Sequence, residues 1–328
     1  MLTIIYNNLL RGIKLSGLKY LQRGINSNTS INLNRKYKEV EIKVPWGKLT
    51  GKHWGPTNIQ PIIAVHGWQD NAASFDPLMN YISEDNSILA IDLPGHGKSS
   101  WIPNGFIYDF LIYTQTIDRI RQHYNMDKIA IIGHSMGGMI SFNYACNFPQ
   151  NMKFIAALDY YKCPPWNANK YQRRFTKEWQ QFFKLEKNIT ASPCYEESDL
   201  MKKSIEATGN SLNESTCKIL YSRGTKKNPD GTISFTRDPR VKYFTLSNIF
   251  THEYMKDIAT RLNFPYRILK GENCDFNESE ESYYDVMKVI ENRSEDFKYH
   301  IVPGTHHFHM DNPEGVAKIL NPFIAKYR

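Results

Sequence analysis

The chain has 328 residues, of which 41% are hydrophobic and 13% aromatic, enough to build a large buried core and to exclude disorder over most of its length. Its net charge of +8 is concentrated in residues 1–38, which carry seven basic residues and no Asp or Glu. Outside that segment 34 Lys and Arg balance 33 Asp and Glu. We therefore expect no nucleic-acid partner.

The five cysteines are widely spaced and odd in number, and no two stand in a C-x-x-C pair. This spacing argues against a zinc site or a disulfide framework and favours reduced thiols in an intracellular protein. No apolar stretch approaches the ~20 residues that a membrane-spanning helix needs, so we expect no transmembrane segment. The sequence does not indicate an oligomeric state.

The N-terminal segment differs from the rest of the chain. In residues 1–15, "MLTIIYNNLLRGIKL", helical spacing places the apolar side chains on one face and Arg11 and Lys14 opposite them. An amphipathic, basic leader without acidic residues is typical of a mitochondrial presequence. We predict that residues 1–38 are an extension of this kind, with the cytoplasm and the peroxisome as alternative locations. The structural alternative is a disordered or surface-docked extension.

From residue 39 onward, short apolar runs alternate with helical segments. The pattern predicts strands at 39–44, 49–55, 61–67, 87–92, 128–133, 154–159, 265–271 and 297–304. It predicts helices at 74–83, 108–124, 136–148, 279–292 and 312–327. The first two strands form an antiparallel pair. The later alternation of strand and helix predicts an α/β fold with a mostly parallel central sheet and helices on both of its faces.

The alternation is interrupted by residues 160–260, which are rich in aromatic and charged side chains and are predicted to be helices without strands. A helical block inserted into an α/β alternation suggests a cap over the domain of residues 39–328. Four aromatic residues of this block are candidates either for an apolar roof over a site or for the core of the cap itself: Trp166, Trp179, Phe182 and Phe183.

Residues 128–142, "KIAIIGHSMGGMISF", contain the motif that most strongly indicates a catalytic function. The pattern G-x-S-x-G, here Gly133 to Gly137, lies between a predicted strand and a predicted helix. In a nucleophile elbow the serine occupies a sharp, strained turn and exposes its hydroxyl, and glycine on either side allows the close approach of backbone. The sequence therefore predicts that Ser135 is a nucleophile.

A serine nucleophile needs a base and a carboxylate that orients the base. The stretch "IVPGTHHFHMDNPE" offers three candidate bases: His306, His307 and His309. The same three histidines raise the possibility of a metal site, but the segment follows a strand end and lacks a zinc-ligand spacing, so we expect no metal. The ends of two predicted strands offer three candidate acids: Asp159, Glu272 and Asp275.

Several motifs together resemble the α/β-hydrolase superfamily over residues 39–328. They are "HGWQDNAASFDPL" at 66–78, "DLPGHGKS" at 92–99, the elbow, and the ending "THHFHMDNPE". The first of these, with the stretch "SRGT…DGTISFTRDPRVK" at 222–242, is similar to the serine hydrolase-like, or kraken-like, group. The resemblance implies an α/β-hydrolase fold with an inserted helical cap.

The resemblance also implies how the negative charge of a reaction intermediate would be stabilised. It places an oxyanion loop at His66-Gly67-Trp68, so the backbone N–H groups of Trp68 and Met136 are expected to form the oxyanion hole. His66 is then expected to support the geometry of the loop, because the donors belong to the main chain.

For the base and the acid, the family pattern G-x-x-H-x-x-H aligns His306 with the catalytic position and His309 with a second, structural histidine. Family patterns of the form G-G-x-S-D-Y place the acid at Asp275. Asp159 and Glu272 stay as alternatives, because some relatives use the position of Asp159.

The implied function is that of a serine hydrolase acting on an ester-like or other small-molecule acyl substrate, with no cofactor. A carboxylic-ester hydrolase is expected first. A carbon–carbon bond hydrolase and an acyltransferase would use the same triad and are kept as alternatives, together with a non-catalytic ligand-binding protein on the same fold.

Overall fold

The computed structural model describes residues 35–165, 168–187, 193–247 and 250–328. Two sequence predictions, the leader and the role of Trp166, fall outside these described residues. None of the described helices is both long and apolar enough to cross a bilayer.

An eight-stranded sheet forms the centre of the domain, in the order β1-β2-β4-β3-β5-β6-β10-β11. Its strands are β1 (Tyr37–Val44), β2 (Gly47–Trp54), β3 (Ile62–Val65), β4 (Ile88–Asp92), β5 (Ile129–His134), β6 (Met152–Leu158), β10 (Tyr266–Gly271) and β11 (Phe297–Val302). β2 pairs antiparallel with β1 and β4, and the pairs from β4 through β3, β5, β6 and β10 to β11 are parallel. The predicted antiparallel pair and mostly parallel sheet are confirmed.

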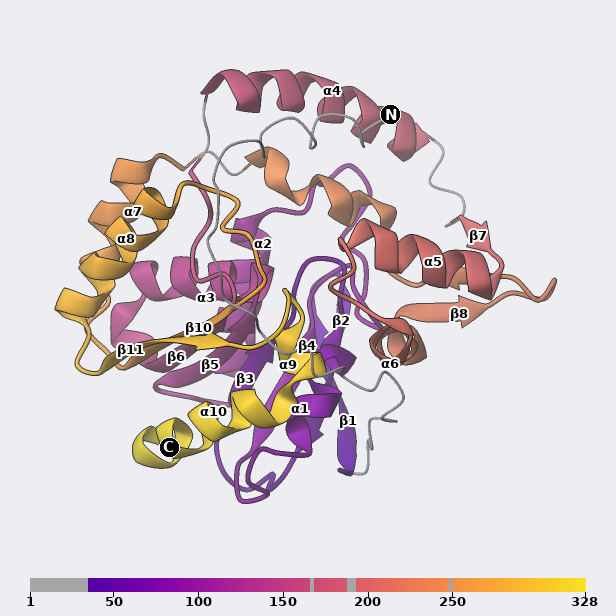
Figure 1. Ribbon diagram of the computed structural model, residues 1–328. Helices are drawn as coiled ribbons and strands as arrows, with labels where there is room; N and C mark the ends of the chain where they lie inside the picture. The colour runs from indigo at the N-terminus through magenta and orange to yellow at the C-terminus, as the bar shows by residue number, and fades with distance from the viewer. Residues whose placement is uncertain (1–34, 166–167, 188–192, 248–249) are drawn as a thin grey trace, which may run out of the picture. The chain divides into compact units, whose positions relative to one another are not determined.

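Helices cover both faces of this sheet (Figure 1). They are α1 (Asp76–Met79), α2 (Phe110–His123), α3 (Met136–Asn147), α8 (Glu280–Arg293), α9 (Phe308–Asp311) and α10 (Pro313–Tyr327), with short 3₁₀ turns at Ala72–Phe75 and Pro149–Asn151. Each face has its own hydrophobic core. α2, α3 and α8 contribute to one core, and α1 and α10 to the other.

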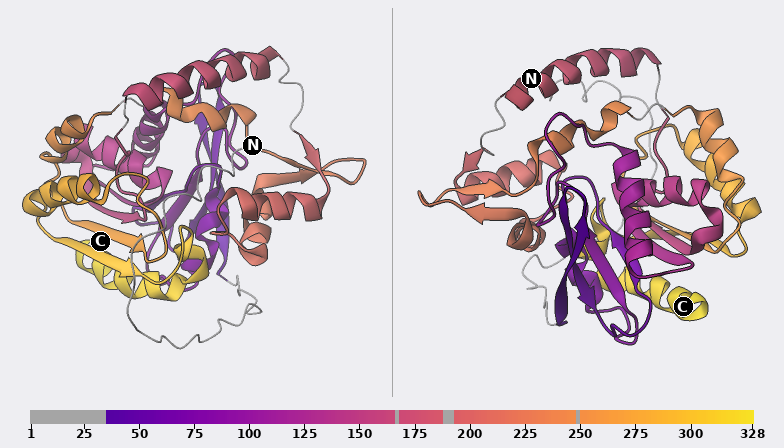
Figure 2. Two further views of the ribbon diagram at one scale, coloured as in Figure 1. Left: turned by 45° about the horizontal axis from the view of Figure 1, so that its top comes forward. Right: turned by 180° about the vertical axis from the view of Figure 1, so that it is seen from behind.

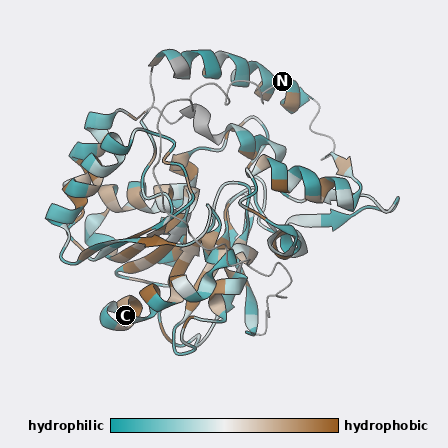
Figure 3. Cartoon of the chain, viewed as in Figure 1, coloured by the Kyte–Doolittle hydropathy of each residue, from teal (hydrophilic) through white to brown (hydrophobic). Residues whose placement is uncertain are grey.

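The strands supply both cores because successive side chains point to opposite faces of a sheet. In β3, Ile63 and Val65 belong to the core of α2 and α3, whereas Ile62 and Ala64 belong to the core of α1 and α10. The hydrophobic colour of Figure 3 is accordingly concentrated on the central strands. Such continuous apolar runs are what a sheet covered on both faces requires.

The chain between β6 and β10 forms an insertion of mixed structure. Its elements are α4 (Ala168–Lys187), β7 (Cys194–Tyr195), α5 (Glu197–Ala207), α6 (Glu214–Gly224), β8 (Thr225–Lys227), β9 (Ile233–Phe235), a 3₁₀ helix (Pro239–Ser247) and α7 (His252–Ala259). The expectation of helices without strands is corrected by the small sheet β7-β9-β8. The β8–β9 hairpin projects away from the main sheet (Figure 2).

The insertion is attached to loops that follow the main strands. The side-chain amide of Asn71, after β3, donates to the Leu220 carbonyl at 2.9 Å. Arg223 donates to the buried carboxylate of Asp92, at the end of β4, with a separation of 2.7 Å. In parallel sheets of this kind, ligands bind beyond the carboxyl ends of the strands. These contacts place the insertion at that edge.

Candidate active site

Ser135 lies at the turn between β5 and α3, in a conformation that side chains rarely adopt. Its φ is +52° and its ψ is −116°. The flanking glycines permit close packing: a Cβ on Gly137 would lie 2.0 Å from the Val65 carbonyl oxygen, and one on Gly133 would lie 2.5 Å from the Gly137 oxygen. The strand-to-helix setting predicted for the G-x-S-x-G pattern is therefore present, with the strain of a nucleophile elbow.

His306 lies beside this turn, because its loop is attached to the residue before the serine. The imidazole Nε2 of His134 donates to the His306 carbonyl at 2.9 Å. The two imidazole rings lie with their centroids 4.8 Å apart. The structure therefore brings together the predicted nucleophile loop and the predicted base.

The imidazole Nδ1 of His306 lies 2.5 Å from Oδ2 of Asp159. Asp159 follows β6 directly, is fully buried and has a φ of +71°. The other oxygen, Oδ1, accepts from Lys270 Nζ at 2.8 Å. Burial acts to raise the pKa of Asp159, but the hydrogen bond and charge of His306 and the charge of Lys270 outweigh it and hold this pKa below its usual value. Asp159 is a carboxylate at neutral pH.

Cys274 completes the surroundings of this carboxylate. Its thiol donates to Asp159 Oδ2 at 2.8 Å and lies 3.8 Å from His306 Nδ1. Burial, together with the negative charge of Asp159, raises the pKa of the thiol to about 12. Cys274 is therefore a protonated hydrogen-bond donor at neutral pH and not a nucleophile.

The prediction of Asp275 as the partner of His306 is corrected by this geometry. Asp275 is exposed, and the contacts it makes toward the site come from its main-chain carbonyl, which accepts from Tyr160 Oη at 2.9 Å and Lys270 Nζ at 3.2 Å. The preceding residue, Cys274, contributes the side chain that points inward. Glu272 is also exposed. Asp159, which the sequence left as an alternative, is the carboxylate that the structure pairs with His306.

The two predicted oxyanion donors lie on the loop after β3 and at the start of α3. Met136 is the first residue of α3, and N–H groups in the first turn of a helix have no acceptor within the helix. Trp68 is next to Gln69, which has a φ of +64°. The indole N–H of Trp68 donates to the Val241 carbonyl of the insertion at 2.9 Å, which holds this loop against the insertion.

The fully buried ring of His66 connects two loops, as its supporting role predicts. Nδ1 donates to the Gly67 carbonyl at 2.7 Å, and Nε2 accepts from the Leu93 N–H at 3.0 Å. Burial lowers the pKa of His66, so the ring is neutral and can serve both contacts. His309 is also fully buried, and its Nε2 bonds to Ser74 Oγ at 2.7 Å, which fits its predicted structural position.

A second buried cluster, which was not predicted from the sequence, lies beside the elbow. Asp70 Oδ2 lies 3.5 Å from both His134 Nδ1 and His307 Nε2. Burial acts to raise the pKa of Asp70, but the two histidines, His307 foremost, more than offset it and hold this pKa well below its usual value. Two signals were available: His134 lies inside the elbow motif, and Asp70 ends the sequence "HGWQD".

Comparisons with known proteins agree with the fold. Residues 60–189 match the family described as alpha/beta hydrolase fold. A "Probable serine hydrolase" of Drosophila melanogaster is 34% identical over 294 residues, covering 88% of each chain. The human "Serine hydrolase-like protein 2" is 28% identical over 303 residues, covering 87% of this chain and 93% of the relative.

Among solved structures, a hypothetical protein of Pseudomonas aeruginosa PAO1 is 24% identical and superposes with a TM-score of 0.75, covering 88% of this chain and 99% of that one. E-2-(Acetamidomethylene)succinate hydrolase is 18% identical with a TM-score of 0.69, covering 88% and 100%. Both show the α/β-hydrolase fold. The chain belongs to the serine hydrolase-like group of the α/β-hydrolase superfamily.

Proposed function

We propose that the protein is a serine hydrolase acting on ester-like or other acyl substrates, with Ser135 as the nucleophile, His306 as the base and Asp159 as the acid. The observation that supports this most strongly is the fixed pair of His306 and Asp159 beside a serine held in a strained elbow. The chain order Ser135, Asp159, His306 is that of α/β hydrolases, and Asp159 follows β6, the strand that pairs with the elbow strand β5.

In the proposed reaction Ser135 Oγ attacks the substrate carbonyl while His306 Nε2 takes the hydroxyl proton. The carboxylate of Asp159 accepts from His306 Nδ1, so it fixes the tautomer and stabilises the imidazolium. The main-chain N–H groups of Met136 and Trp68 hold the oxyanion. The imidazolium then protonates the leaving alkoxide, and an acyl-enzyme forms. Water then attacks the acyl-enzyme, with His306 again as the base. This step releases the carboxylic acid product and restores the hydroxyl group of Ser135.

The insertion is proposed to be a cap that contributes to substrate choice, because Asn71 and Trp68 of the oxyanion loop are hydrogen-bonded to Leu220 and Val241 of the insertion. Trp179 and Phe183 of α4 are partly exposed, with 38% and 46% of their surface accessible. Phe182 is buried against Tyr243, with ring centroids 5.9 Å apart. We assign Phe182 to the core of the cap, and Trp179 and Phe183 to its accessible surface.

Turnover of p-nitrophenyl esters of graded chain length tests this proposal. We expect hydrolysis by the wild type and a loss on the order of 10⁶ in turnover for Ser135→Ala, the size seen when a triad nucleophile is removed. Ser141→Ala, which removes a hydroxyl from the same helix, is the matched control and keeps its turnover. Activity of Ser135→Ala above a tenth of the wild type contradicts the proposal.

The alternatives give different outcomes in the same assay. An acyltransferase transfers the acyl group to an added alcohol in preference to water. A carbon–carbon bond hydrolase forms the acyl-enzyme slowly from simple esters and cleaves a diketone instead. A ligand-binding protein hydrolyses none of the esters, although it retains the fold.

A further inference from the structure

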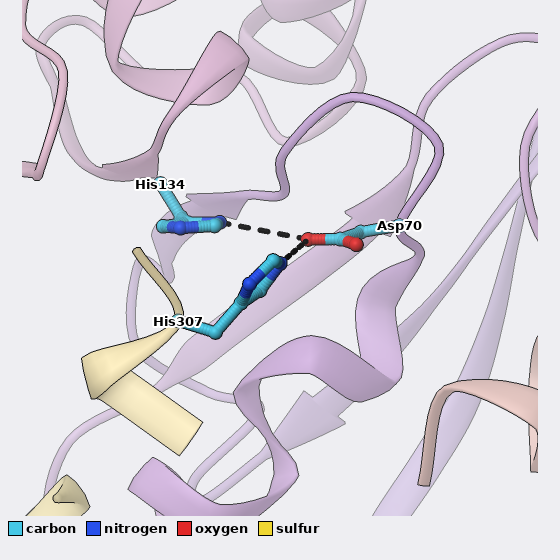
Figure 4. A group of neighbouring side chains, drawn as sticks. All are labelled: Asp70, His134 and His307. Carbon is cyan, nitrogen blue, oxygen red and sulfur yellow. Dashed lines mark ion pairs between the residues drawn. The ribbon is translucent and has the colours of Figure 1, made fainter. Parts of the chain in front are cut away.

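We propose that Asp70, His134 and His307 form a binding site for one divalent transition-metal ion of the Zn²⁺ class. The three residues come from the loop after β3, the end of β5 and the loop before α9, and Figure 4 shows both imidazoles directed at the same carboxylate. All three are at least 94% buried. The spacing of the three histidines in the C-terminal motif had predicted no metal, but that motif contains only one of these three residues, His307.

The distances between the side chains fit a metal better than a direct hydrogen bond. Charge-assisted N–H···O bonds are about 2.7–2.9 Å long. In the neighbouring pair, His306 Nδ1 and Asp159 Oδ2 are 2.5 Å apart. Asp70 Oδ2 is instead held 3.5 Å from both His134 Nδ1 and His307 Nε2. Two ligand atoms of a tetrahedral zinc ion, each about 2.0–2.1 Å from it, are separated by about 3.4 Å.

Two of the three ligand atoms have no hydrogen-bond partner among the residues that the structure describes: Asp70 Oδ2 and His134 Nδ1. The tautomer of His134 is fixed by its other nitrogen, because the His306 carbonyl at 2.9 Å can only accept. Nδ1 is therefore the nitrogen that is left to coordinate an ion, and it faces a carboxylate oxygen. Two buried polar atoms that face each other without a hydrogen bond are unfavourable unless another group, such as a metal ion, satisfies both of them.

The second nitrogen of each imidazole is bonded in the way that metal ligands require. Histidine ligands commonly donate their other N–H to a carbonyl or another oxygen, which fixes the ring. His134 Nε2 bonds to the His306 carbonyl, and His307 Nδ1 lies 2.8 Å from Ser211 Oγ. Both metal-facing nitrogens are thus oriented by partners on other parts of the chain.

Gly67 keeps side-chain atoms away from two of the three ligand atoms. A Cβ at this position would lie 2.9 Å from His134 Nδ1 and 3.0 Å from Asp70 Oδ2. Two imidazole nitrogens and one carboxylate oxygen are a donor set for zinc and its neighbours, whereas Ca²⁺ and Mg²⁺ prefer oxygen alone. The bound ion would connect the three loops that carry Trp68, Ser135 and His306 without touching the proposed catalytic side chains.

Cobalt(II) substitution of the full chain tests the site without reference to catalysis. Metal-free protein is titrated with Co²⁺, and the visible absorption of tetrahedral cobalt is followed together with the bound stoichiometry. We expect one equivalent to bind, with displacement by Zn²⁺ and an increase in the melting temperature, because a ligand that binds only the folded state stabilises it. Asp70→Asn and His307→Gln, checked for folding by circular dichroism, should lose the band.

Two further variants make the test specific. Gly67→Ala keeps all three ligands but places a Cβ against two of the ligand atoms, and we expect affinity to fall by about 10- to 100-fold, as for other changes around a metal site. Cys274→Ser is the control, because Asp159, Cys274 and His306 form a second group with ligand atoms within 4.8 Å of one another. It should leave the band unchanged.

Three results would overturn the assignment. The first is the absence of stoichiometric binding by folded wild-type protein. The second is unchanged binding in Asp70→Asn and His307→Gln. The third is a thiolate-to-cobalt charge-transfer band that Cys274→Ser removes, which would place the ion at the second group.

Discussion

The carboxylate of Asp159 and the imidazole of His306 are joined by a 2.5 Å contact between Oδ2 and Nδ1, although 147 positions separate them in the chain. β6 and β10 are parallel neighbours, and β11 follows β10 in the sheet. The residue after β6 and the loop after β11 therefore meet at the same edge. The contact is a consequence of strand order, and it pairs Asp159 with His306.

The first prediction concerns this acid. Asp159→Asn keeps the shape of the side chain but removes its charge and favours the wrong tautomer of His306, which in a trypsin-like triad costs about 10⁴ in turnover. We expect a loss of this size in steady-state ester hydrolysis. Asp275→Asn and Glu272→Gln are controls that should stay within about tenfold of wild type, because changes at exposed side chains usually have small effects. A loss that falls on Asp275→Asn instead would contradict the geometry.

The sequence predicted the elbow and the position of His306 beside it but did not favour the carboxylate that pairs with His306, and the reason is local. The order of glycines, serine and flanking apolar runs around Ser135 specifies a strand-turn-helix by itself. The choice between Asp159 and Asp275 depends on which side chain of the β10 loop turns inward, and there Cys274 occupies the inward position. The sequence "KGENCDFNE" has no periodicity that would predict which of its side chains points inward. Asp159 has a positive φ, which could not be predicted from the sequence either.

The second prediction separates packing from substrate contact within the insertion. Phe182 is 4% exposed and packs against Tyr243, so Phe182→Ala should lower the free energy of unfolding by about 3 kcal/mol or more through the cavity that it leaves. Phe183→Ala should change stability by less than about 0.5 kcal/mol, because that side chain is partly exposed. Denaturant unfolding followed by circular dichroism measures both.

The same pair should differ in selectivity. We expect Phe183→Ala to shift the preferred ester chain length more than it changes turnover of the shortest ester. A uniform loss across the ester series would show that Phe183, too, only holds the insertion together.

The third prediction is a dependence of stability on pH through Asp296, which joins the start of β11 to α10. Its carboxylate accepts from Arg267 at 2.7 Å, Lys326 at 2.8 Å and Tyr327 at 2.6 Å. Burial acts to raise the pKa of Asp296, but the bonds from Lys326, Tyr327 and Arg267 outweigh it and lower the pKa.

Because the folded-state pKa is depressed, this group stabilises the fold above the unfolded-state pKa of about 3.9, and the contribution is lost as the pH falls toward the folded value. Asp296→Asn should therefore be less stable than wild type at pH 7, and the difference should shrink below about pH 4. Urea unfolding over a series of pH values measures it. A difference that stays constant down to the acid limit would exclude the linkage.

The fourth prediction concerns residues 1–38, which lie mostly outside the described part of the chain. Their acid-free, basic and amphipathic composition supports the proposal that they direct mitochondrial import. A fluorescent reporter fused to this segment should be imported, and a version with Arg11→Glu and Lys14→Glu should not. A diffuse signal from the unaltered fusion would reject the proposal.

The architecture was more predictable from the sequence than the details of the insertion. Buried strands such as Ile129–His134 read as continuous apolar runs, and their alternation with helices defines the sheet. The strands of the small sheet are two or three residues long, too short for a periodic pattern. The turn at Asp230-Gly231, where Gly231 has a φ of +89°, was the available sign of the β8–β9 hairpin.

The central claim is that Ser135 is an activated nucleophile, and covalent labelling tests it most directly. A fluorophosphonate reacts with a serine only when a neighbouring base and an oxyanion site assist. Intact-mass and peptide analysis of the labelled full chain should show one adduct, located on Ser135, that is absent from Ser135→Ala and strongly reduced in Asp159→Asn. Folded wild-type protein that remains unlabelled, or an adduct on a different residue, would contradict the account.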